Sequence, residues 1–228
     1  MIRRTMIKQL ALSLIMIVFS ATSWADTQTI RVLDKNGNPV NNAVILINKS
    51  VLASPHGAQD NVIIDQVDKQ FVPKVSSIQE GSTVVFPNSD NIRHHVYSFS
   101  KAKPFELKLY SDQERPKVTF DKPGVVTLGC NIHDDMIGYV VINNALQGFV
   151  SDASGKVSIE FNDAVSKQSQ AITLRVWHPW MGDDLNAGEL IELKMPIKNS
   201  DIKLDVAPPA PKKEEKSRLE KRFNRLGA

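Results

Sequence analysis

The sequence predicts an all-β fold, and three observations lead to this prediction. Short segments rich in β-branched and aromatic residues recur between residues 61 and 143 and appear again in both flanks. Turn-forming residues such as Glu80-Gly81 and Lys122-Pro123-Gly124 separate these segments. Between residues 61 and 143 no stretch has sustained helical periodicity. Many short strands at this spacing are typical of a Greek-key sandwich or barrel.

The chain begins with the features of a secretory signal. Basic residues near the start precede an apolar core, Leu10–Phe19, and a small-x-Ala cleavage site, Ser23-Trp24-Ala25. The apolar core is too short to span a bilayer. We therefore expect residues 1–25 to be a signal peptide that is cleaved after Ala25, which makes the mature protein periplasmic. No later segment approaches spanning length, so we expect no transmembrane span.

The flanks, residues 26–60 and 144–206, predict a second and smaller β-sandwich. The first flank reads as strand, turn and strand, with the turn at Asp34-Lys35-Asn36-Gly37, and the second repeats this pattern around Asp152-Ala153-Ser154-Gly155. Read together with the middle removed, the flanks resemble the transthyretin-like, or carboxypeptidase regulatory-like, sandwich. This resemblance implies that residues 61–143 form a domain inserted into a discontinuous one.

An N-terminal strand extension followed by a separate C-terminal domain is the alternative organisation. We favour the insertion because neither flank alone has enough strands to bury a core. Chain ends that lie close together in a domain also permit such an insertion.

The strands expected in the central segment are Val62–Gln66, Pro73–Ile78, Thr83–Pro87, His95–Phe99, Phe105–Tyr110, Lys117–Phe120, Val125–Leu128 and Gly138–Ile142.

The end of the chain, residues 207–228, predicts a Pro-rich linker and a charged tail. Residues 212–225 hold seven basic and three acidic side chains, and Leu219, Phe223 and Leu226 follow helical spacing. We expect a solvated tail, with weak contact to an anionic surface or a partner as the alternative. Outside the leader the basic and acidic residues balance, so we expect no nucleic-acid partner.

The chain has one cysteine, Cys130, and it stands in a pattern typical of metal ligands. His133 follows three residues later and Met136 three residues after that, and His94-His95 supplies further imidazoles upstream. A plane of two histidines and one cysteine with a weak axial methionine is the ligand set of a mononuclear electron-transfer copper site. The pattern therefore predicts one copper ion, cycling between Cu(I) and Cu(II), and an inert buried thiol is the alternative.

The segment from Val62 to Ile142 resembles the plastocyanin, amicyanin and pseudoazurin group of cupredoxins. The early-strand motifs Gln70-Phe71-Val72-Pro73 and Gly81–Asn88 are similar, and the Cys-x2-His-x2-Met spacing is the compact version of the group's ligand motif. The resemblance implies a Greek-key cupredoxin domain over residues 61–143. The whole pattern also resembles proteins named for methylamine utilisation, which implies a possible link to an amine dehydrogenase.

The resemblance also selects one of the paired histidines. His94-His95-Val96 stands where the group has His-Asn-Val, which implies that His94 binds copper together with Cys130, His133 and Met136. Neighbouring residues of a strand face opposite sides, so only one of the two imidazoles can reach the metal. Three further residues are expected to surround the ligands without binding the metal: Asn88, His95 and Ile132.

Ile132 is a departure from the group, which commonly has proline at this position. Because isoleucine keeps the backbone N–H that proline lacks, Ile132 is expected to donate a second hydrogen bond to the sulfur, beside the one expected from the backbone of His95. Such a bond withdraws charge from the thiolate and should raise the reduction potential. An Ile132→Pro variant whose potential does not fall would count against this hypothesis.

These observations predict an outer-sphere electron carrier and not an enzyme. Its expected partner is a periplasmic redox protein, a cytochrome or a dehydrogenase, that binds transiently. Copper delivery or assembly of another enzyme's copper centre is the alternative, although the chain after Ala25 has no Met-rich repeat. The sequence has no His-x-His pair of the multicopper oxidases, and no serine-nucleophile or phosphate-loop motif. A binding module with an auxiliary copper site is a further possibility.

Overall fold

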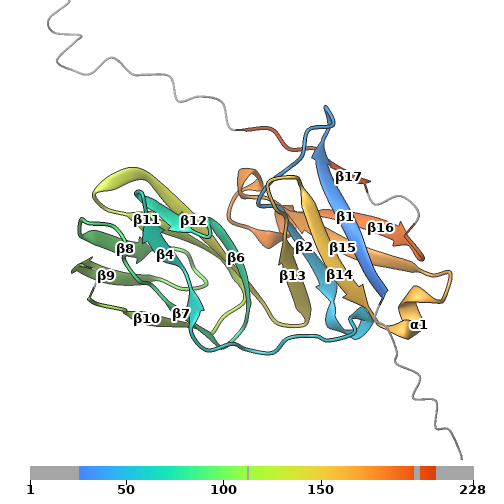
Figure 1. Ribbon diagram of the computed structural model, residues 1–228, viewed down its shortest axis with the longest axis horizontal. Coiled ribbons are helices and arrows are strands. Elements are labelled where there is room, and N and C mark those ends of the chain that lie inside the picture. Colours follow the sequence, from blue (N-terminus) through green and yellow to red (C-terminus); the bar gives the residue numbers. More distant parts are fainter. Residues whose placement is uncertain (1–25, 112, 198–200, 209–228) are drawn as a thin grey trace, which may run out of the picture.

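The structure is a computed structural model that describes residues 26–111, 113–197 and 201–208. The predicted signal peptide and the charged part of the tail lie outside these residues. The predicted all-β fold class is confirmed, because strands form nearly all of the regular structure. Figure 1 shows two lobes side by side. No helix in the described ranges is long and apolar enough to cross a membrane.

The central lobe, residues 62–143, is a sandwich of two sheets with an additional hairpin. Its larger sheet has the strand order β6-β12-β11-β8-β9, its smaller sheet has the order β10-β7-β3, and β4 pairs with β5. The strands are β3 (Val62–Ile63), β4 (Asp65–Val67), β5 (Gln70–Val72), β6 (Val75–Gln79), β7 (Ser82–Val85), β8 (His94–Ser98), β9 (Phe105–Tyr110), β10 (Lys117–Phe120), β11 (Gly124–Cys130) and β12 (His133–Asn143).

The first expected strand of this lobe is divided in two. Val62–Ile63 pairs with β7, and the N–H of Ile64 donates to the carbonyl of Val85 at 3.0 Å. The chain then turns away, and β4 pairs with β5 through a tight turn in which Asp68 and Lys69 have positive φ angles of 50° and 58°. Alternation of polarity predicted extended chain here, but it does not show a change of pairing partner.

The flanking lobe combines strands from both sides of the central lobe. Its two sheets have the orders β14-β1-β17 and β13-β2-β15-β16. Strand β1, from the first flank, pairs with β14 and β17 from the second, and β2 pairs with β13 and β15. The strands are β1 (Asp26–Asp34), β2 (Val44–Asn48), β13 (Leu146–Val150), β14 (Lys156–Phe161), β15 (Ala171–Trp177), β16 (Glu189–Lys194) and β17 (Asp201–Leu204).

Short helices complete the flanking lobe, and two aspartates hold its turns. The helices are η1 (Lys49–Val51), α1 (Asp163–Ser166), η2 (Pro179–Met181) and η3 (Leu185–Ala187).

Asp34 accepts hydrogen bonds within its own turn, and Asp152 accepts from the N–H groups of Lys156 and Ser154 at 2.9 and 2.8 Å. These bonds hold the pKa of Asp152 below its ordinary value. A side chain at Gly155 would place its Cβ 2.4 Å from the carbonyl oxygen of Val32, so this turn packs directly on β1.

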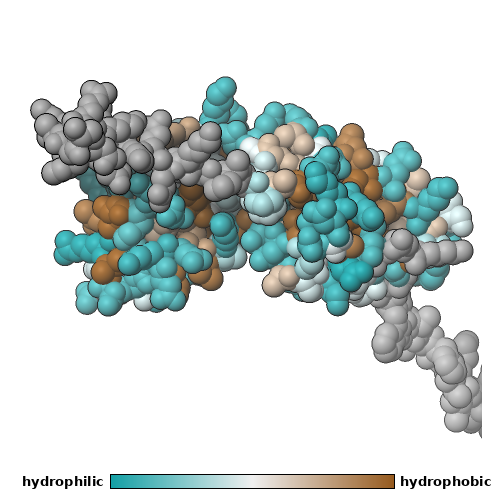
Figure 2. All heavy atoms as spheres, turned by 90° about the horizontal axis from the view of Figure 1, so that it is seen from above, coloured by the Kyte–Doolittle hydropathy of each residue, from teal (hydrophilic) through white to brown (hydrophobic). Residues whose placement is uncertain are grey.

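A third apolar layer joins the two lobes. Val44, Leu46 and Trp177 of the flanking lobe are buried together with residues of β6, β11 and β12. The ring of Trp177 meets the ring of Tyr139 edge to face, with 6.0 Å between centroids. Strand β2 is buried on both faces, because Ile45 belongs to the core between the two flanking sheets. The four sheets therefore stack with three apolar layers between them, and polar residues cover most of the face shown in Figure 2.

The position of Trp177 differs from expectation. The aromatic run from Trp177 to Trp180 predicts a plug that closes the flanking sandwich. In the structure Val176 faces the core of that sandwich, whereas Trp177, the next residue, faces the central lobe. Alternation along β15 accounts for this difference, because adjacent side chains of a strand point to opposite faces.

Candidate metal centre

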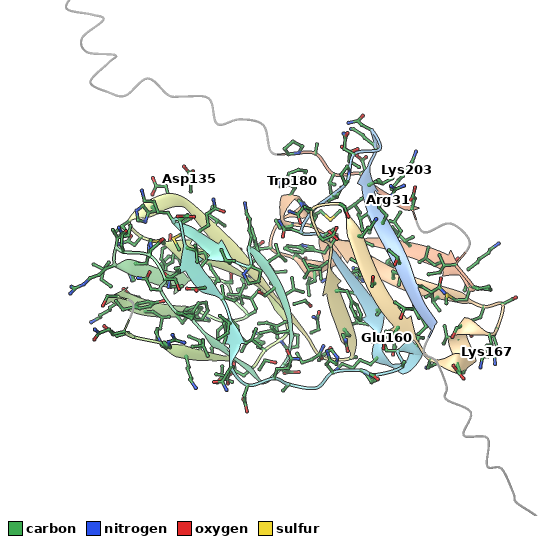
Figure 3. All side chains as sticks on the ribbon, in the orientation of Figure 1. Arg31, Asp135, Glu160, Lys167, Trp180 and Lys203 are labelled. Atoms are coloured by element: carbon green, nitrogen blue, oxygen red, sulfur yellow. The ribbon has the colours of Figure 1, made fainter. Side chains whose placement is uncertain are left out.

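The ends of three adjacent strands bring Cys130 and two histidines together. Cys130 ends β11, His133 begins β12 and His94 begins β8. Strand β11 pairs antiparallel with both neighbours, with Cys130 opposite Val96 on β8 and opposite His133 on β12. Antiparallel pairing puts the end of β11 beside the starts of β8 and β12. The site lies at the end of the central lobe that carries the labelled Asp135 in Figure 3.

The segment that carries Cys130, His133 and Met136 is a tight hairpin. Only Asn131 and Ile132 join β11 to β12, and the pairing register shifts between Gly129 and Cys130. This irregularity lets Cys130 pair with His133 while Gly129 pairs with Ile137. A bulge of this kind re-aims side chains at the edge of a sheet.

The three donor atoms are spaced as ligands of one metal ion. The Cys130 Sγ atom lies 3.6 Å from Nδ1 of His94 and 3.7 Å from Nδ1 of His133. Metal–sulfur and metal–nitrogen bonds of about 2.3 and about 2.0 Å, as in zinc sites, separate sulfur and nitrogen by about 3.5–3.8 Å for angles between tetrahedral and trigonal. All three donor atoms lie within 4.8 Å of one another. One soft thiolate with two imidazoles suits copper, so a single copper ion fits this group.

The side chains that carry the three donor atoms differ in their exposure. His94 is completely buried and Cys130 is 3% exposed, whereas His133 is half-buried. An unpaired thiol that is buried between two imidazoles is protected from solvent oxidants, and it retains the donors that a soft metal prefers. The edge of His133 is therefore the part of the group nearest to solvent.

A carboxylate fixes the ring of His94. Nε2 of His94 lies 2.7 Å from Oδ2 of Asp90, and the imidazole N–H donates to this oxygen. With the proton on Nε2, the lone pair is on Nδ1, which is the atom that faces the sulfur. Histidine ligands of metal sites are commonly held in this way by a carboxylate or a carbonyl.

The carboxylate of Asp90 is itself held by backbone donors. The N–H groups of Asp68 and Lys69 donate to it at 2.7 and 2.9 Å. Burial alone would raise the pKa of Asp90, but the hydrogen bonds from Lys69, His94 and Asp68 outweigh it and hold the pKa below its ordinary value. The group is therefore a carboxylate at neutral pH.

Asn88 shapes the loop that leads to His94. Its side chain is 2% exposed, and its amide donates to the carbonyls of Ile92 and Tyr110 at 2.9 and 3.1 Å. Its Oδ1 accepts the N–H of Asp90 at 3.1 Å. Asn88 thus holds the backbone at Asp90 and at Ile92, in the loop that leads to His94, and it makes no hydrogen bond to the three donor atoms.

His95 points away from the donor atoms. Its Nε2 lies 2.9 Å from a carboxylate oxygen of Glu106, an ion-pair distance without hydrogen-bond geometry. The rings of His95 and Tyr97 on β8 and of Phe99, which directly follows this strand, form a row. Tyr97 lies over the residue before Cys130, because a Cβ at Gly129 would be only 2.8 Å from its ring.

Met136 and Ile132 occupy opposite environments. Met136 is 1% exposed and belongs to the same buried cluster as Cys130. Ile132 is 48% exposed, and in the described part of the chain its N–H is not among the hydrogen-bond partners of the sulfur. Its expected effect on the potential stays a prediction. Asp134 and Asp135, on the same hairpin, are exposed.

The structure therefore brings together three of the residues that the sequence singled out, His94, Cys130 and His133. Sequence reasoning missed Asp90 and Tyr97. The available signal for Asp90 was a carboxylate four residues before the histidine, within a turn. No sequence signal connects Tyr97 to Gly129, because their contact depends on the pairing of β8 with β11.

No protein-family model and no curated protein matches the chain. Among solved structures, part of the chain is similar to a copper-containing nitrite reductase from Thermus scotoductus SA-01, with 29% identity over 41% of this chain and 25% of that chain, and a TM-score of 0.35. A reduced mutant of amicyanin has 20% identity over 45% of this chain and 100% of its own, with a TM-score of 0.33. A purple cupredoxin from Nitrosopumilus maritimus has 22% identity over 37% and 99%, with a TM-score of 0.33.

The chain spans only a quarter of the nitrite reductase. Each of these similarities covers less than half of this chain. These partial similarities do not define the chemistry of the site. That chemistry is inferred from the donor atoms of this chain and the distances between them.

Proposed function

We propose that the chain is a periplasmic type 1 (blue) copper protein that carries single electrons between redox partners. The observation that carries this proposal is the buried sulfur of Cys130, with the Nδ1 atoms of His94 and His133 at 3.6 and 3.7 Å. The proposed ligands are these three residues and Met136 as a weak axial donor. Residues 61–143 would form the copper domain, inserted in the sandwich of residues 26–60 and 144–206.

A bound copper ion would supply reversible one-electron chemistry, and the residues of the chain supply its rigid surroundings. Cys130 and His133 are held by the β11–β12 ladder, and His94 is held by β8 and by Asp90. Because these ligands are fixed before metal binds, a change of charge at the site requires little movement. The apolar cluster around Cys130 and Met136 keeps water away from the thiolate.

His133 is the proposed point of electron exchange. It is half-buried, whereas His94 and Cys130 are buried. Ile132 and Ile137, which are 48% and 38% exposed, form an apolar surface on the same hairpin. A redox partner, such as a cytochrome or a dehydrogenase, would bind this small surface transiently.

Copper delivery or assembly is the second candidate, and burial of the donors favours the electron carrier over it. Delivery requires release of the metal to a partner, which is slow where two donors are buried and the third is held in a ladder. Rapid reversible oxidation without copper loss would support the carrier. Transfer of copper to a metal-free acceptor on mixing would support delivery.

The proposal is tested by copper loading of matched methionine variants. We expect Met136→Leu to keep the intense thiolate-to-copper band while its reduction potential shifts, since the axial ligand tunes the potential. Met181→Leu is the control, because Met181 packs in the flanking lobe and should leave the potential unchanged. Equal potentials for the two variants would exclude Met136 as a ligand. Cell fractionation of the expressed full chain tests the periplasmic location.

A further inference from the structure

We propose that Asp90 is an anionic positioning residue that lowers the reduction potential of the copper site through His94. This inference rests on the proposed function. Oδ2 of Asp90 accepts the Nε2–H bond of His94 at 2.7 Å. The side chain of His94 is completely buried and that of Asp90 is 12% exposed, so solvent screens this contact only weakly.

Both oxygens of the Asp90 carboxylate have backbone donors. Oδ1 accepts the N–H of Asp68 at 2.7 Å, and Oδ2 accepts the N–H of Lys69 at 2.9 Å. The two donors lie in the tight β4–β5 turn, 21 and 22 residues away in the sequence. The β4–β5 hairpin therefore fixes the position of the Asp90 carboxylate independently of any metal. The carboxylate in turn fixes the imidazole of His94.

The bond to Asp90 makes Nδ1 of His94 a stronger donor. A carboxylate that accepts the imidazole N–H increases the basicity of the other ring nitrogen. A stronger donor and a nearby negative charge both favour Cu(II) over Cu(I), because the oxidised site carries one more positive charge. The partly buried carboxylate of Asp90 should therefore lower the potential, an effect opposite to that expected from hydrogen bonds to the sulfur.

The exposed acids of the ligand hairpin have a different position. Asp135 lies on β12, two residues from His133, and its side chain is exposed. Its charge is close to the site in sequence but is screened by water and mobile ions. Asp135→Asn removes the same charge as Asp90→Asn, so it is a matched control for a purely electrostatic effect at the surface.

The test is the reduction potential of the copper-loaded full chain, measured for wild type, Asp90→Asn, Asp90→Glu and Asp135→Asn at two salt concentrations. We expect Asp90→Asn to shift the Cu(II)/Cu(I) equilibrium about tenfold towards Cu(I), which is about 59 mV for one electron. Asp90→Glu keeps the charge and should recover part of the shift. Asp135→Asn should shift the equilibrium less, with an effect that disappears at high salt.

Two results would overturn the role of Asp90. One is a coloured Asp90→Asn protein with a potential equal to that of Asp135→Asn. If the variant does not fold, the wild-type protein in its Cu(I) state provides the second test, because His94 should show a slowly exchanging Nε2–H signal by NMR. A rapidly exchanging proton would overturn the proposal. A wild-type protein without the thiolate-to-copper band would instead contradict the proposed function itself.

Discussion

His94 and Cys130 are 36 residues apart in the chain, yet Nδ1 of one lies 3.6 Å from Sγ of the other. The pairing of β8 with β11 produces this contact. His95, the next residue, lies on the opposite face of β8 beside Glu106. One residue of register therefore decides which imidazole faces the sulfur.

The paired histidines should respond differently to removal. We expect His94→Ala to abolish the thiolate-to-copper band, since it deletes one of the two proposed nitrogen ligands. His95→Ala should keep the band, because its ring does not contact the donor atoms. Visible spectra of the copper-loaded variants check this, and a band that survives in His94→Ala but not in His95→Ala would reverse the assignment.

Gly129 should not tolerate a side chain. An added Cβ would lie 2.8 Å from Cζ and 2.9 Å from the hydroxyl of Tyr97, so the ring would have to move. Overpacking of this kind costs about 1–3 kcal/mol. Urea unfolding of Gly129→Ala measures the loss. Gly57→Ala is the control, because nothing lies within 4 Å of its added Cβ.

A second substitution tests the cause of that loss. Tyr97→Leu replaces the ring by a shorter aliphatic side chain. This substitution should restore part of the stability in the Gly129→Ala background. If the double variant is as unstable as the sum of the two single variants, contact with Tyr97 is not the cause.

The sequence predicted the all-β class and the residues that converge at the site, for identifiable reasons. Alternating and β-branched segments indicate strands. Cys130, His133 and Met136 stand close together in the sequence, so a single short connection between two strands is enough to explain their spacing. The contact of Asp90 with the β4–β5 turn could not be predicted in this way. It joins residues more than 20 positions apart, and its donors are backbone groups that are common to all residues.

The layer between the lobes was also missed, although one signal was present. The run Ala43-Val44-Ile45-Leu46-Ile47 has no polar alternation, which is typical of a strand buried on both faces. Nothing in this run identifies the partner sheet, which is supplied by β6, β11 and β12. Only the three-dimensional arrangement shows that Trp177 packs against the central lobe.

Trp177 should couple the unfolding of the two lobes. Its side chain is fully buried, so Trp177→Ala should cost about 3–5 kcal/mol. We expect the unfolding curve to separate into two transitions, one followed by the copper band and one by circular dichroism. Trp180→Ala, at a site that is 46% exposed, should leave a single transition. A single transition in both variants would show that the coupling between the lobes does not depend on Trp177.

Stability should fall between about pH 7 and about pH 5 because of His178. Burial lowers the pKa of its imidazole from the ordinary 6.5, and the neutral ring donates to the carbonyl of Asn41 and accepts the N–H of Trp180. In this range the unfolded chain binds a proton that the folded chain does not, so stability decreases as pH falls. Urea unfolding at both pH values should show a smaller decrease for His178→Gln than for wild type. His56→Gln, in an exposed loop, is the control, and an equal decrease in all three proteins would contradict the prediction.

The most direct measurement is the visible and EPR spectrum of the purified protein after addition of one equivalent of Cu(II). A buried sulfur shared with two imidazoles predicts an intense thiolate-to-copper band, narrow copper hyperfine splitting and one ion per chain, with the band lost in Cys130→Ser. A colourless protein whose thiol still reacts freely with an alkylating agent would contradict the copper assignment.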